Sequence, residues 1–590
     1  MWQKISTADP VKQLQHYERE WAKHWGGAPT RPEDASEVED MFRIPVWVQS
    51  RCSVDALRGA SNKFKIRTCT KGGWHPKHFA LLGDASLNIL SWVFWFFTMA
   101  GQLPKELQQI EVALYRKPTG GRRPIGFFDS VYRLWSAVTR DRVQTWEDQL
   151  MQDHPAFNAV AGCSVLDPVY RQAMRAEAAR HSKELVLLVL LDLAKCYEHV
   201  RHDLLWRQGI ELHYPLAELR VTIQSYRWER RLTLDGILGK AIWPAGGIVA
   251  GHSHATTELK LYMLKVVRQH VIAYPKPALN IFVDDLAVDG AAPNEEALLR
   301  QVLPATRQLI NSFGEELHLP VAASKVAVVG STWSVTKAAE ESFGLLRGKG
   351  AQAVRYLGVD AAAGRSLAHA SGTSVRQARR SIFRRRFARL RRLQGKGTKK
   401  GLVFAAGLQA GVTYGKEVWG VPRGFRLELR RKAAAAHGLV TKGGSVDLAW
   451  QLIHPQQDPE QLALATIIRW AKEVLWATAP PDERPAAATS LYPLLTMFGK
   501  VWRKVKAELQ ASTRKRPAVR GPHLGRYLHA ARVGLDHCHT DPLPGRPAEG
   551  CQAARTAASH AQGLFAGDRT ARHARQGGGQ GLLTSSRWCS

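Results

Sequence analysis

The segment that most constrains the fold is ELVLLVLLDL, residues 184–193. It is a continuous run of branched aliphatic side chains, without the alternation of apolar and polar residues that a half-exposed strand shows. Such a run predicts a β-strand that is buried on both faces. After it, Tyr197, Val200 and Leu204 fall at helical spacing, so the strand is expected to lead into an amphipathic helix. Asp192 stands at the end of the buried run.

Two adjacent aspartates separate two short apolar runs in LNIFVDDLAVDG, residues 279–290. Aspartate is favoured in hairpin turns, so Asp284 and Asp285 are expected at the tip of a tight hairpin. A hairpin tip beside the end of a buried strand would bring these two carboxylates and Asp192 to one site. Asp289 is expected only to begin the next turn, with the glycine that follows it.

Three converging carboxylates suit the joining of a nucleotide to a growing strand. That reaction uses two divalent ions, which activate the attacking hydroxyl and neutralise the departing pyrophosphate. Magnesium takes hard oxygen ligands, usually a few carboxylates together with substrate phosphates and water. Taken alone, however, an aspartate pair in a turn is a weak signal of this chemistry.

The charge of the chain points to a polyanionic partner. Its 590 residues contain 83 Lys and Arg against 51 Asp and Glu, a net charge of +32. Neutralising phosphates releases counterions and gives strong binding, which favours a nucleic acid. A charged surface that only keeps the protein soluble, and an anionic membrane, are the alternatives. The 7 cysteines form no CxxC pair, which fits a reducing compartment.

Nothing in the sequence predicts secretion or a membrane span. The first thirteen residues have no apolar core, so they do not resemble a secretory signal. The most apolar segment, LNILSWVFWFFTMAG at residues 87–101, is too short to cross a bilayer. It is expected to be a buried core helix. The protein is therefore expected inside the cell and not on a membrane.

Residues 376–400 contain many Lys and Arg and no acid, yet keep an apolar stripe at helical spacing through Phe383, Phe387 and Leu390. A merely solvated helix face would mix charges to limit repulsion. A helix that contacts phosphates is therefore favoured. Its candidate nucleic-acid-binding residues are Arg379, Arg380, Arg384, Arg385, Arg386 and Arg389.

Several of these motifs resemble those of reverse transcriptases. LLDLAKCYEHVRHDLL, residues 190–205, is similar to the family's first aspartate motif, in which Tyr or Phe follows the Asp by five residues. FVDD, residues 282–285, is similar to its aromatic–x–Asp–Asp motif. Similar segments follow the family's order at residues 115–143, 322–330 and 354–360, and the basic helix stands where a thumb belongs. Their content resembles the enzymes of non-LTR (LINE-type) retrotransposons more than the retroviral ones.

The resemblance implies which residues bind metal and select the sugar. Asp192, Asp284 and Asp285 would be the metal-binding carboxylates, Asp285 the least direct, and the backbone carbonyl of Leu193 would complete the shell. The metal would be Mg2+, two ions, with Mn2+ as an alternative. Tyr197 would be a steric gate beneath the incoming sugar, where its ring clashes with a 2′-hydroxyl.

The resemblance also implies contacts to the triphosphate and the primer. Lys117 and Arg123 would hold the triphosphate, with Arg122 equally placed. Lys325 would donate a proton to the leaving pyrophosphate, although an exposed lysine without that role fits its position nearly as well. The primer end would be braced by Tyr356, Leu357 and Gly358.

One segment departs from the family pattern. PAGGIVAGHSHATTELK, residues 244–260, lies where the family usually has Gln-Gly and then Ser-Pro. Gly247 can stand for the family glycine beside the nucleotide, but Gly246 replaces the glutamine, and a Gly-His pair replaces Ser-Pro. His252 and His254 are interpreted as loop residues rather than metal ligands.

The sequence therefore predicts an α+β right-hand polymerase with an antiparallel palm sheet. Its partners would be an RNA template with a DNA primer and dNTPs; its oligomeric state stays open. The alternatives are a degenerate reverse transcriptase kept as an RNA-binding protein and an RNA-templated RNA polymerase. Localisation is expected to be nuclear, with assembly in the cytoplasm. The expected parts are an N-terminal extension with loose segments (1–75), fingers (76–183), palm (184–360), basic helical thumb (361–440), helical connection (441–510) and disordered basic tail (511–590).

Overall fold

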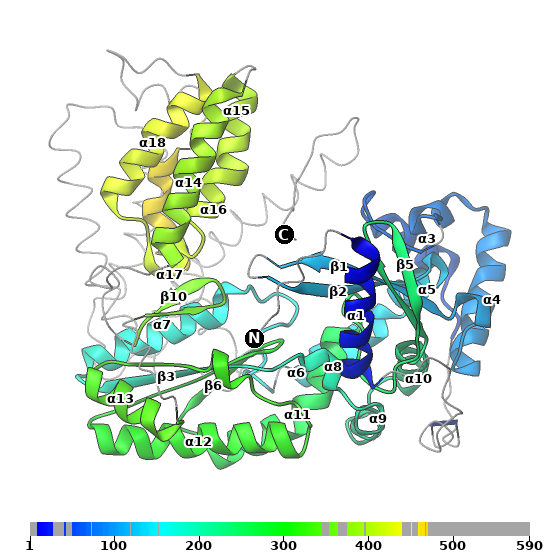
Figure 1. Ribbon diagram of the computed structural model, residues 1–590, viewed down its shortest axis with the longest axis horizontal. Helices are drawn as coiled ribbons and strands as arrows, with labels where there is room; N and C mark the ends of the chain where they lie inside the picture. Colours follow the sequence, from blue (N-terminus) through cyan, green and yellow to red (C-terminus); the bar gives the residue numbers. More distant parts are fainter. Residues whose placement is uncertain are drawn as a thin grey trace, which may run out of the picture. The chain divides into compact units, whose positions relative to one another are not determined.

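The computed structural model describes most of the chain up to residue 469 (Figure 1). The described residues are 9–26, 41–42, 50–71, 73–117, 120–151, 153–344, 353–363, 375–393, 397–438, 450, 458–466 and 468–469. They all belong to the first of two compact units. The second unit, Ala471–Asp482 with Thr489–Cys589, lies outside the described residues. So do most of the expected connection and all of the expected tail.

The first sheet is antiparallel, with strand order β6-β7-β3-β8. Its strands are β6 (Ala278–Phe282), β7 (Asp285–Ala292), β3 (Leu185–Asp192) and β8 (Ala327–Gly330). In β3, Leu187 and Val189 enter the main core, whereas Leu188 and Leu190 enter a separate cluster on the opposite face. The predicted strand buried on both faces is confirmed, and with it the mixed α+β class.

Helices cover both faces of this sheet (Figure 1). On one side, α12 (Glu295–Glu315) packs on β7 and β3, and α13 (Trp333–Ser342) packs on β8. On the other, α7 (Leu166–His181) packs on β3 and β7. The Asn294 side chain caps α12 by accepting a hydrogen bond from the amide of Ala297. Two glutamates in the first turn stabilise the helix through their attraction to the positive end of its dipole.

The second sheet has the order β2-β1-β4-β5, with β1 and β4 parallel and the other pairs antiparallel. Its strands are β1 (Gln109–Arg116), β2 (Arg122–Phe127), β4 (Glu229–Leu234) and β5 (Ile237–Ile242). The helix α1 (Pro10–Trp25) packs on β4 and β5. Around α5 (Ser130–Val138) lie α3 (Val54–Lys63) and the short helix Pro76–Leu81, and α3 also contacts α4 (Asp84–Ala100).

The N-terminal part contains helices that pack on the main core. Within the expected extension (1–75), α1 buries Leu14 and Trp21 and α3 buries Leu57 in this core, whereas residues 27–40 lie outside the described residues. The helix α4 is only half a core helix: Phe94 and Phe97 are buried, but Ile89, Trp92 and Phe96 are more than half exposed. Within the described ranges no helix is long and apolar enough to cross a membrane.

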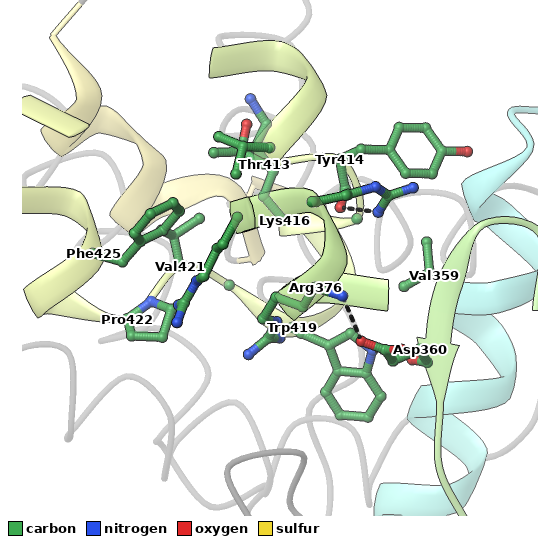
Figure 2. A pocket seen from close by; sticks show the side chains of 15 residues that line it. Val359, Asp360, Arg376, Thr413, Tyr414, Lys416, Trp419, Val421, Pro422 and Phe425 are labelled. Carbon is green, nitrogen blue, oxygen red and sulfur yellow. Dashed lines mark hydrogen bonds between the residues drawn. The ribbon is translucent and has the colours of Figure 1, made fainter. Parts of the chain in front are cut away.

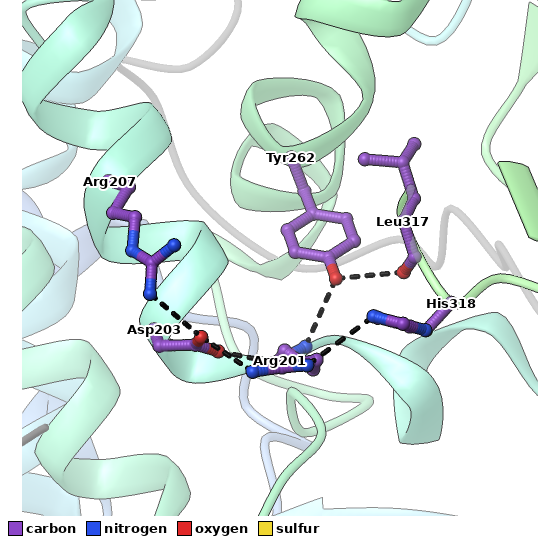
Figure 3. A network of polar contacts seen from close by, with 6 residues as sticks. All are labelled: Arg201, Asp203, Arg207, Tyr262, Leu317 and His318. Carbon is purple, nitrogen blue, oxygen red and sulfur yellow. Dashed lines mark hydrogen bonds and ion pairs between the residues drawn. The ribbon is translucent and has the colours of Figure 1, made fainter. Parts of the chain in front are cut away.

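Further helices connect the two sheets: α6 (Arg140–Met151), α8 (Cys196–His199), α9 (His202–Glu211), α10 (Leu216–Tyr226) and α11 (Ala255–Ala273). A polar network ties the start of α9 to α11 and to the segment after α12 (Figure 3). The Tyr262 hydroxyl donates to the carbonyl of Leu317 at 2.8 Å and accepts the amide of Arg201 at 3.4 Å. The Arg201 guanidinium binds Asp203 and contacts His318. The network fixes the loop that precedes Lys325.

The C-terminal part of the described chain is a hairpin followed by helices. The elements are β9 (Val354–Tyr356), β10 (Val359–Ala361), α14 (Val375–Arg392), α15 (Gly397–Val403), a π-helix at Phe404–Gln409, α16 (Ala410–Val412), α17 (Lys416–Trp419), α18 (Arg423–His437) and a short helix at Pro459–Leu464. Phe383, Phe387 and Leu390 are buried in a separate core, so the predicted apolar stripe is confirmed. The basic helix ends at Arg392, earlier than expected.

Asp289 does not begin a turn, contrary to the expectation. It lies inside β7, is 3% exposed, and accepts two hydrogen bonds from Arg175 of α7, at 2.8 and 2.6 Å. Such a bidentate pair is strong because both groups are charged and the fork matches the carboxylate. The second strand of the hairpin is therefore longer than the sequence suggested.

Candidate active site

The backbone brings the three aspartates together. Asp192 is the last residue of β3 and stands directly opposite Asp285, the first residue of β7. Asp284 belongs to the two-residue turn between β6 and β7, and its carbonyl accepts the amide of Leu193 at 3.1 Å. The expected hairpin with the aspartates at its tip is thus found, and one bond ties that tip to the end of β3.

The tip of this hairpin is strained. Val283, the first turn residue, has φ of 60°. Two-residue hairpins with a positive φ at this position favour glycine, and a β-branched residue is a genuine outlier there. Strain of this kind persists only where surrounding structure over-determines the backbone, and it gathers at functional sites. The turn therefore presents Asp284 in a fixed conformation rather than an adaptable one.

The three carboxylates repel one another. Burial, followed by the charges of Asp284 and Asp192, raises the pKa of Asp285 to about 6. Burial is also the main cause that raises the pKa of Asp284, and Asp192 adds to it. Like charges held together disfavour ionisation, so the site gains from any cation that binds there.

A lysine already supplies part of that positive charge. The Nζ of Lys325 lies 2.5 Å from Oδ1 of Asp192, and both groups remain accessible to solvent. Lys325 belongs to the turn Ala323–Lys325. This turn is held beside Asp192 because the amide of Ala322 donates a hydrogen bond to the carbonyl of Asp192. The predicted proton donor therefore lies at the aspartates.

The three carboxylates are suitable ligands for a divalent ion, although their side chains are not yet arranged around one metal position. Over the residues that the structure describes, no group of three or more His, Cys, Asp or Glu side chains is arranged to hold a metal ion. The carboxylates would have to turn toward one ion, with Lys325 leaving Asp192 and substrate phosphates completing the shell. In the same described part, the carbonyl of Leu193 accepts no hydrogen bond, which leaves it available as a ligand.

The segment that bears Tyr197 is supported by Gly247. The amide of Ile248 donates to the carbonyl of Tyr197 at 2.8 Å, and the amide of Gly247 donates to Val200 at 2.9 Å. Gly247 has φ of 83°, and a Cβ there would meet backbone atoms of Tyr197 and Glu198 at 3.0–3.1 Å. Only glycine permits this approach. Tyr197 is partly buried with its hydroxyl 3.5 Å from Thr256, and burial raises its pKa to about 12.

Gly247 is also bound by His202 and Arg230, which the sequence did not indicate as site residues. The carbonyl of Gly247 accepts hydrogen bonds from Nε2 of His202 at 3.0 Å and from Nη2 of Arg230 at 3.3 Å. Arg230 is 1% exposed, and burial lowers its pKa to about 9. The sequence could have signalled Arg230 only through its place in the strand-like ERRLTL, where it cannot be told apart from its partly buried neighbour Arg231.

The altered segment at 244–260 is well packed despite its unusual residues. Gly251 approaches Gly126 so closely that a Cβ would lie 2.7 Å from the carbonyl oxygen of Gly126. His252 is buried between the hydroxyls of Tyr132 and Tyr226, at 2.8 and 3.0 Å. His254 is also buried. These contacts fit the interpretation of both histidines as loop residues.

The three candidates for triphosphate binding have different surroundings. Arg122 donates to the carbonyl of Leu114 at 3.1 Å and lies over the ring of Tyr17. Arg123, on the other face of β2, is exposed, and its charge lowers the pKa of Asp284. Lys117 is exposed near Lys195. Arg122 is thus occupied within the protein, which favours Arg123 and Lys117 for the triphosphate.

The candidate primer-bracing residues form the turn between β9 and β10. Leu357 and Gly358 have φ of 45° and 80°, as in a two-residue hairpin turn. The side chain of Tyr356 is buried against the first sheet, so it packs rather than faces a ligand. Arg379 donates to the carbonyl of Gly358 at 2.6 Å and stacks on Tyr414, so the helical part of the chain holds this turn. Tyr414 and Asp360, from the helical part and from β10, line one pocket beside it (Figure 2).

The six candidate arginines of α14 fall into two groups. Arg379 and Arg380 are half-buried; Arg380 lies over the ring of Phe425. The exposed ones are Arg384, Arg385, Arg386 and Arg389. Only this second group presents its guanidinium groups freely to solvent, where phosphates could reach them.

Residues 115–361 match the family described as "Reverse transcriptase (RNA-dependent DNA polymerase)". Among solved structures, the chain is similar to apo telomerase from Candida Tropicalis truncated from its C-terminal domain, with 14% identity and a TM-score of 0.33, over 50% of this chain and 61% of that one. It is also similar to telomerase from Candida Tropicalis in complex with a TWJ fragment of telomeric RNA, with 12% identity and a TM-score of 0.35, over 72% and 66%. These TM-scores are too low to establish a common overall fold. No curated protein matches the chain.

The matched residues contain every candidate for metal, nucleotide and primer contact, from Lys117 to Gly358. Reverse transcriptase domains generally use divalent metal ions, which agrees with the chemistry of the aspartates. Residues 115–361 are therefore a reverse transcriptase domain, the domain of RNA-directed DNA polymerases, which are nucleotidyltransferases.

Proposed function

We propose that this protein is an active reverse transcriptase of a non-LTR, LINE-type retroelement, which adds dNTPs to a DNA primer on an RNA template. The observation that carries the proposal is the register of the first sheet: Asp192 opposite Asp285, with Asp284 at the strained tip between them. The order of the sequence motifs supports the LINE-type assignment. The short basic cluster TRKRP at 513–517 would permit entry into the nucleus.

In this mechanism Asp192, Asp284 and the carbonyl of Leu193 would hold the metal, with Asp285 less direct. Two Mg2+ ions, or Mn2+, supply activation of the 3′-hydroxyl and neutralisation of the pyrophosphate when bound. Arg123 and Lys117 bind and orient the triphosphate. Lys325, whose Nζ lies 2.5 Å from Oδ1 of Asp192, would be placed to give a proton to the leaving pyrophosphate.

The experiment is primer extension on an RNA template with Mg2+. Wild type is expected to extend with dNTPs. Asp284→Asn should lose at least about a thousandfold in rate while keeping its affinity for primer–template, since it removes a ligand that acts in the reaction. Asp235→Asn is the matched control: Asp235 also lies in a hairpin turn, with φ of 50°, between β4 and β5. Binding without metal-dependent extension by wild type would refute the proposal.

The sugar preference separates a DNA polymerase from an RNA polymerase. Tyr197→Val removes the ring beneath the sugar, so this variant should accept rNTPs far better than wild type. The measurement is the ratio of kcat/KM for dNTP and rNTP. If wild type already uses rNTPs as well as dNTPs, Tyr197 is not a gate and the RNA polymerase alternative gains.

The second candidate is a degenerate protein that only binds RNA. The observation in its favour is the loss of the glutamine and the Ser-Pro step at 244–260. The primer-extension assay separates the two candidates. If the protein is degenerate, the wild type should bind primer–template, with an affinity that falls as salt rises, and should extend no primer.

A further inference from the structure

The helix α1 ends about ninety residues before the matched domain, yet it packs against α8, which bears Tyr197 (Figure 1). It belongs to the same main core, into which it places Leu14, Trp21 and Trp25. Its contacts reach two separate segments of the pocket. Each contact involves the last two turns of the helix.

The first segment is the loop between Asp192 and Tyr197. Lys195 has φ of 49°, a left-handed conformation that a lysine adopts rarely. Its ammonium lies 3.7 Å from Oε1 of Glu20, contacts His24, and stands 4.7 Å from the ring centre of Trp21. Three side chains of α1 thus surround one amine, and they hold this loop in a conformation it would not keep alone.

The second segment is the glycine pair in front of Tyr197. The carbonyl of Trp25 accepts the amides of Ala245, at 2.9 Å, and Gly246, at 3.4 Å. The ring of Trp25 lies 4.7 Å from the guanidinium of Arg230. Arg230 in turn donates to the carbonyl of Gly247. Glycines have no side chains with which to anchor themselves, so the hold on this segment comes from outside it.

The earlier turns of α1 reach the neighbouring strands. The side chain of Gln13 accepts from Arg122 of β2 at 3.4 Å, and Glu18 accepts the amide of Lys240 in β5 at 2.6 Å. The helix is therefore fixed along its length to the sheet that carries Arg123. It cannot move without moving its contacts at the pocket.

We propose that α1 is a positioning element of the nucleotide pocket, in which Glu20 and Trp25 fix the Lys195 loop and the 245–247 segment against Tyr197. The inference rests on the proposed function, because the pocket is that of the incoming dNTP. Glu20 and Trp25 do not touch substrate. They set the distance between the sugar gate and the glycine wall that faces it.

The test uses the full chain with Glu20→Gln, Lys195→Met and the double variant. Glu20→Gln keeps the shape and removes only the charge that faces Lys195. Each single variant should raise the KM for dNTP about tenfold, as expected for loss of a charge-assisted contact, with a smaller change in kcat. The double variant should be no worse than the singles, because the two residues act as one pair. Affinity for primer–template should stay within twofold.

Lys23→Ala is the matched control, since Lys23 is an exposed lysine on the same turns of α1; it should leave the KM for dNTP unchanged. If Lys195→Met raises this KM but Glu20→Gln does not, Lys195 acts directly on substrate and the proposal is wrong. The proposal also fails if neither variant changes it.

Amide exchange tests the positioning without activity. The amides of Ala245 and Gly246 should exchange faster in Trp25→Leu than in Lys23→Ala, because the ring of Trp25 helps to hold the helix end that binds them. If wild type shows no primer extension, the proposed function is wrong, but the exchange rates of these amides still test whether α1 positions the segment. Unchanged exchange in Trp25→Leu would overturn the positioning role.

Discussion

At the residue scale, Glu258 is the carboxyl group that folding removes most completely from water among the residues that the structure describes. It is 0% exposed in α11, accepts a hydrogen bond from Tyr226, and burial raises its pKa to about 7. An unfolded glutamate ionises near pH 4.3. Between these values the folded protein binds a proton that the unfolded chain has lost, so stability falls as pH rises.

Glu258→Gln should remove this pH dependence. Relative to the variant, wild type should lose up to about 3 kcal/mol of unfolding free energy between pH 4.5 and 8, most of it below pH 7. Urea unfolding at four pH values measures it. Parallel curves for wild type and variant would show that Glu258 ionises in the fold with a compensating partner.

Gly247 offers a second prediction at this scale. Gly247→Ala should cost about 1–2 kcal/mol for its left-handed φ, and more for overlap with the backbone of Tyr197 and Glu198. It should also raise the KM for dNTP. Gly236→Ala is the control, since Gly236 has φ of 85° with nothing near a Cβ. Thermal unfolding and dNTP titration of both variants separate strain from overlap; equal effects would contradict the close approach.

The sequence predicted where the aspartates lie better than it predicted the residues that support them. Asp192 and Asp284 could be placed together because one ends a buried strand and the other lies in a hairpin turn, within motifs that resemble those of reverse transcriptases. Arg230 and Lys195 could not, because their roles depend on burial and on the approach of α1, which local sequence does not encode. Asp289 was misinterpreted for the same reason: its partner Arg175 lies on another element.

At the element scale, the two groups of arginines on α14 should behave differently. Replacing Arg384, Arg385, Arg386 and Arg389 with Gln should weaken primer–template binding for every sequence. It should reduce the slope of log K against log salt by up to about 3.6, since each of the four phosphate contacts contributes about 0.9. The stability of the protein should hardly change, because these side chains are exposed.

Arg379→Gln is the contrasting variant. Arg379 donates to the carbonyls of Gly358 and Tyr414, so its loss should loosen the β9–β10 turn and lower the melting temperature. If the variant with all four exposed arginines replaced keeps the wild-type slope of log K against log salt, α14 does not bind phosphates.

Elements with strong periodicity were predictable, and their ends were not. The burial of β3 on both faces follows from an unbroken aliphatic run, and the stripe of α14 follows from Phe383, Phe387 and Leu390. The exposed face of α4 was missed because hydropathy counts apolar side chains without saying which have partners. Ile89, Trp92 and Phe96 lie on a face that nothing in the sequence distinguishes from the buried one.

At the scale of the whole molecule, the described chain has more than one hydrophobic core. The main core joins α1, both sheets and the helices around them, and a separate core gathers Phe383, Phe404 and Leu429 in the C-terminal helices. The β9–β10 hairpin lies between them, with Tyr356 packed on the first sheet and Gly358 bound by Arg379. Besides this hairpin, α17 packs on α7 and Arg469 pairs with Asp167, but neither contact joins the two sets of buried side chains. The two cores should therefore open with different free energies.

Phe404→Ala tests this independence. Phe404 is 0% exposed, with its ring 6.0 Å from Phe383 and 5.9 Å from Phe387, so its truncation should cost about 3–5 kcal/mol within its own core. Amide exchange should accelerate in α14 and α18 and stay unchanged in β3. Phe313→Ala, in the main core, should give the reverse pattern. The proposed nucleic-acid binding uses α14, whereas the aspartates are held by β3 and β7. Phe404→Ala should therefore lose primer–template affinity while the first sheet stays intact; equal acceleration in β3 would show that the two cores unfold as one.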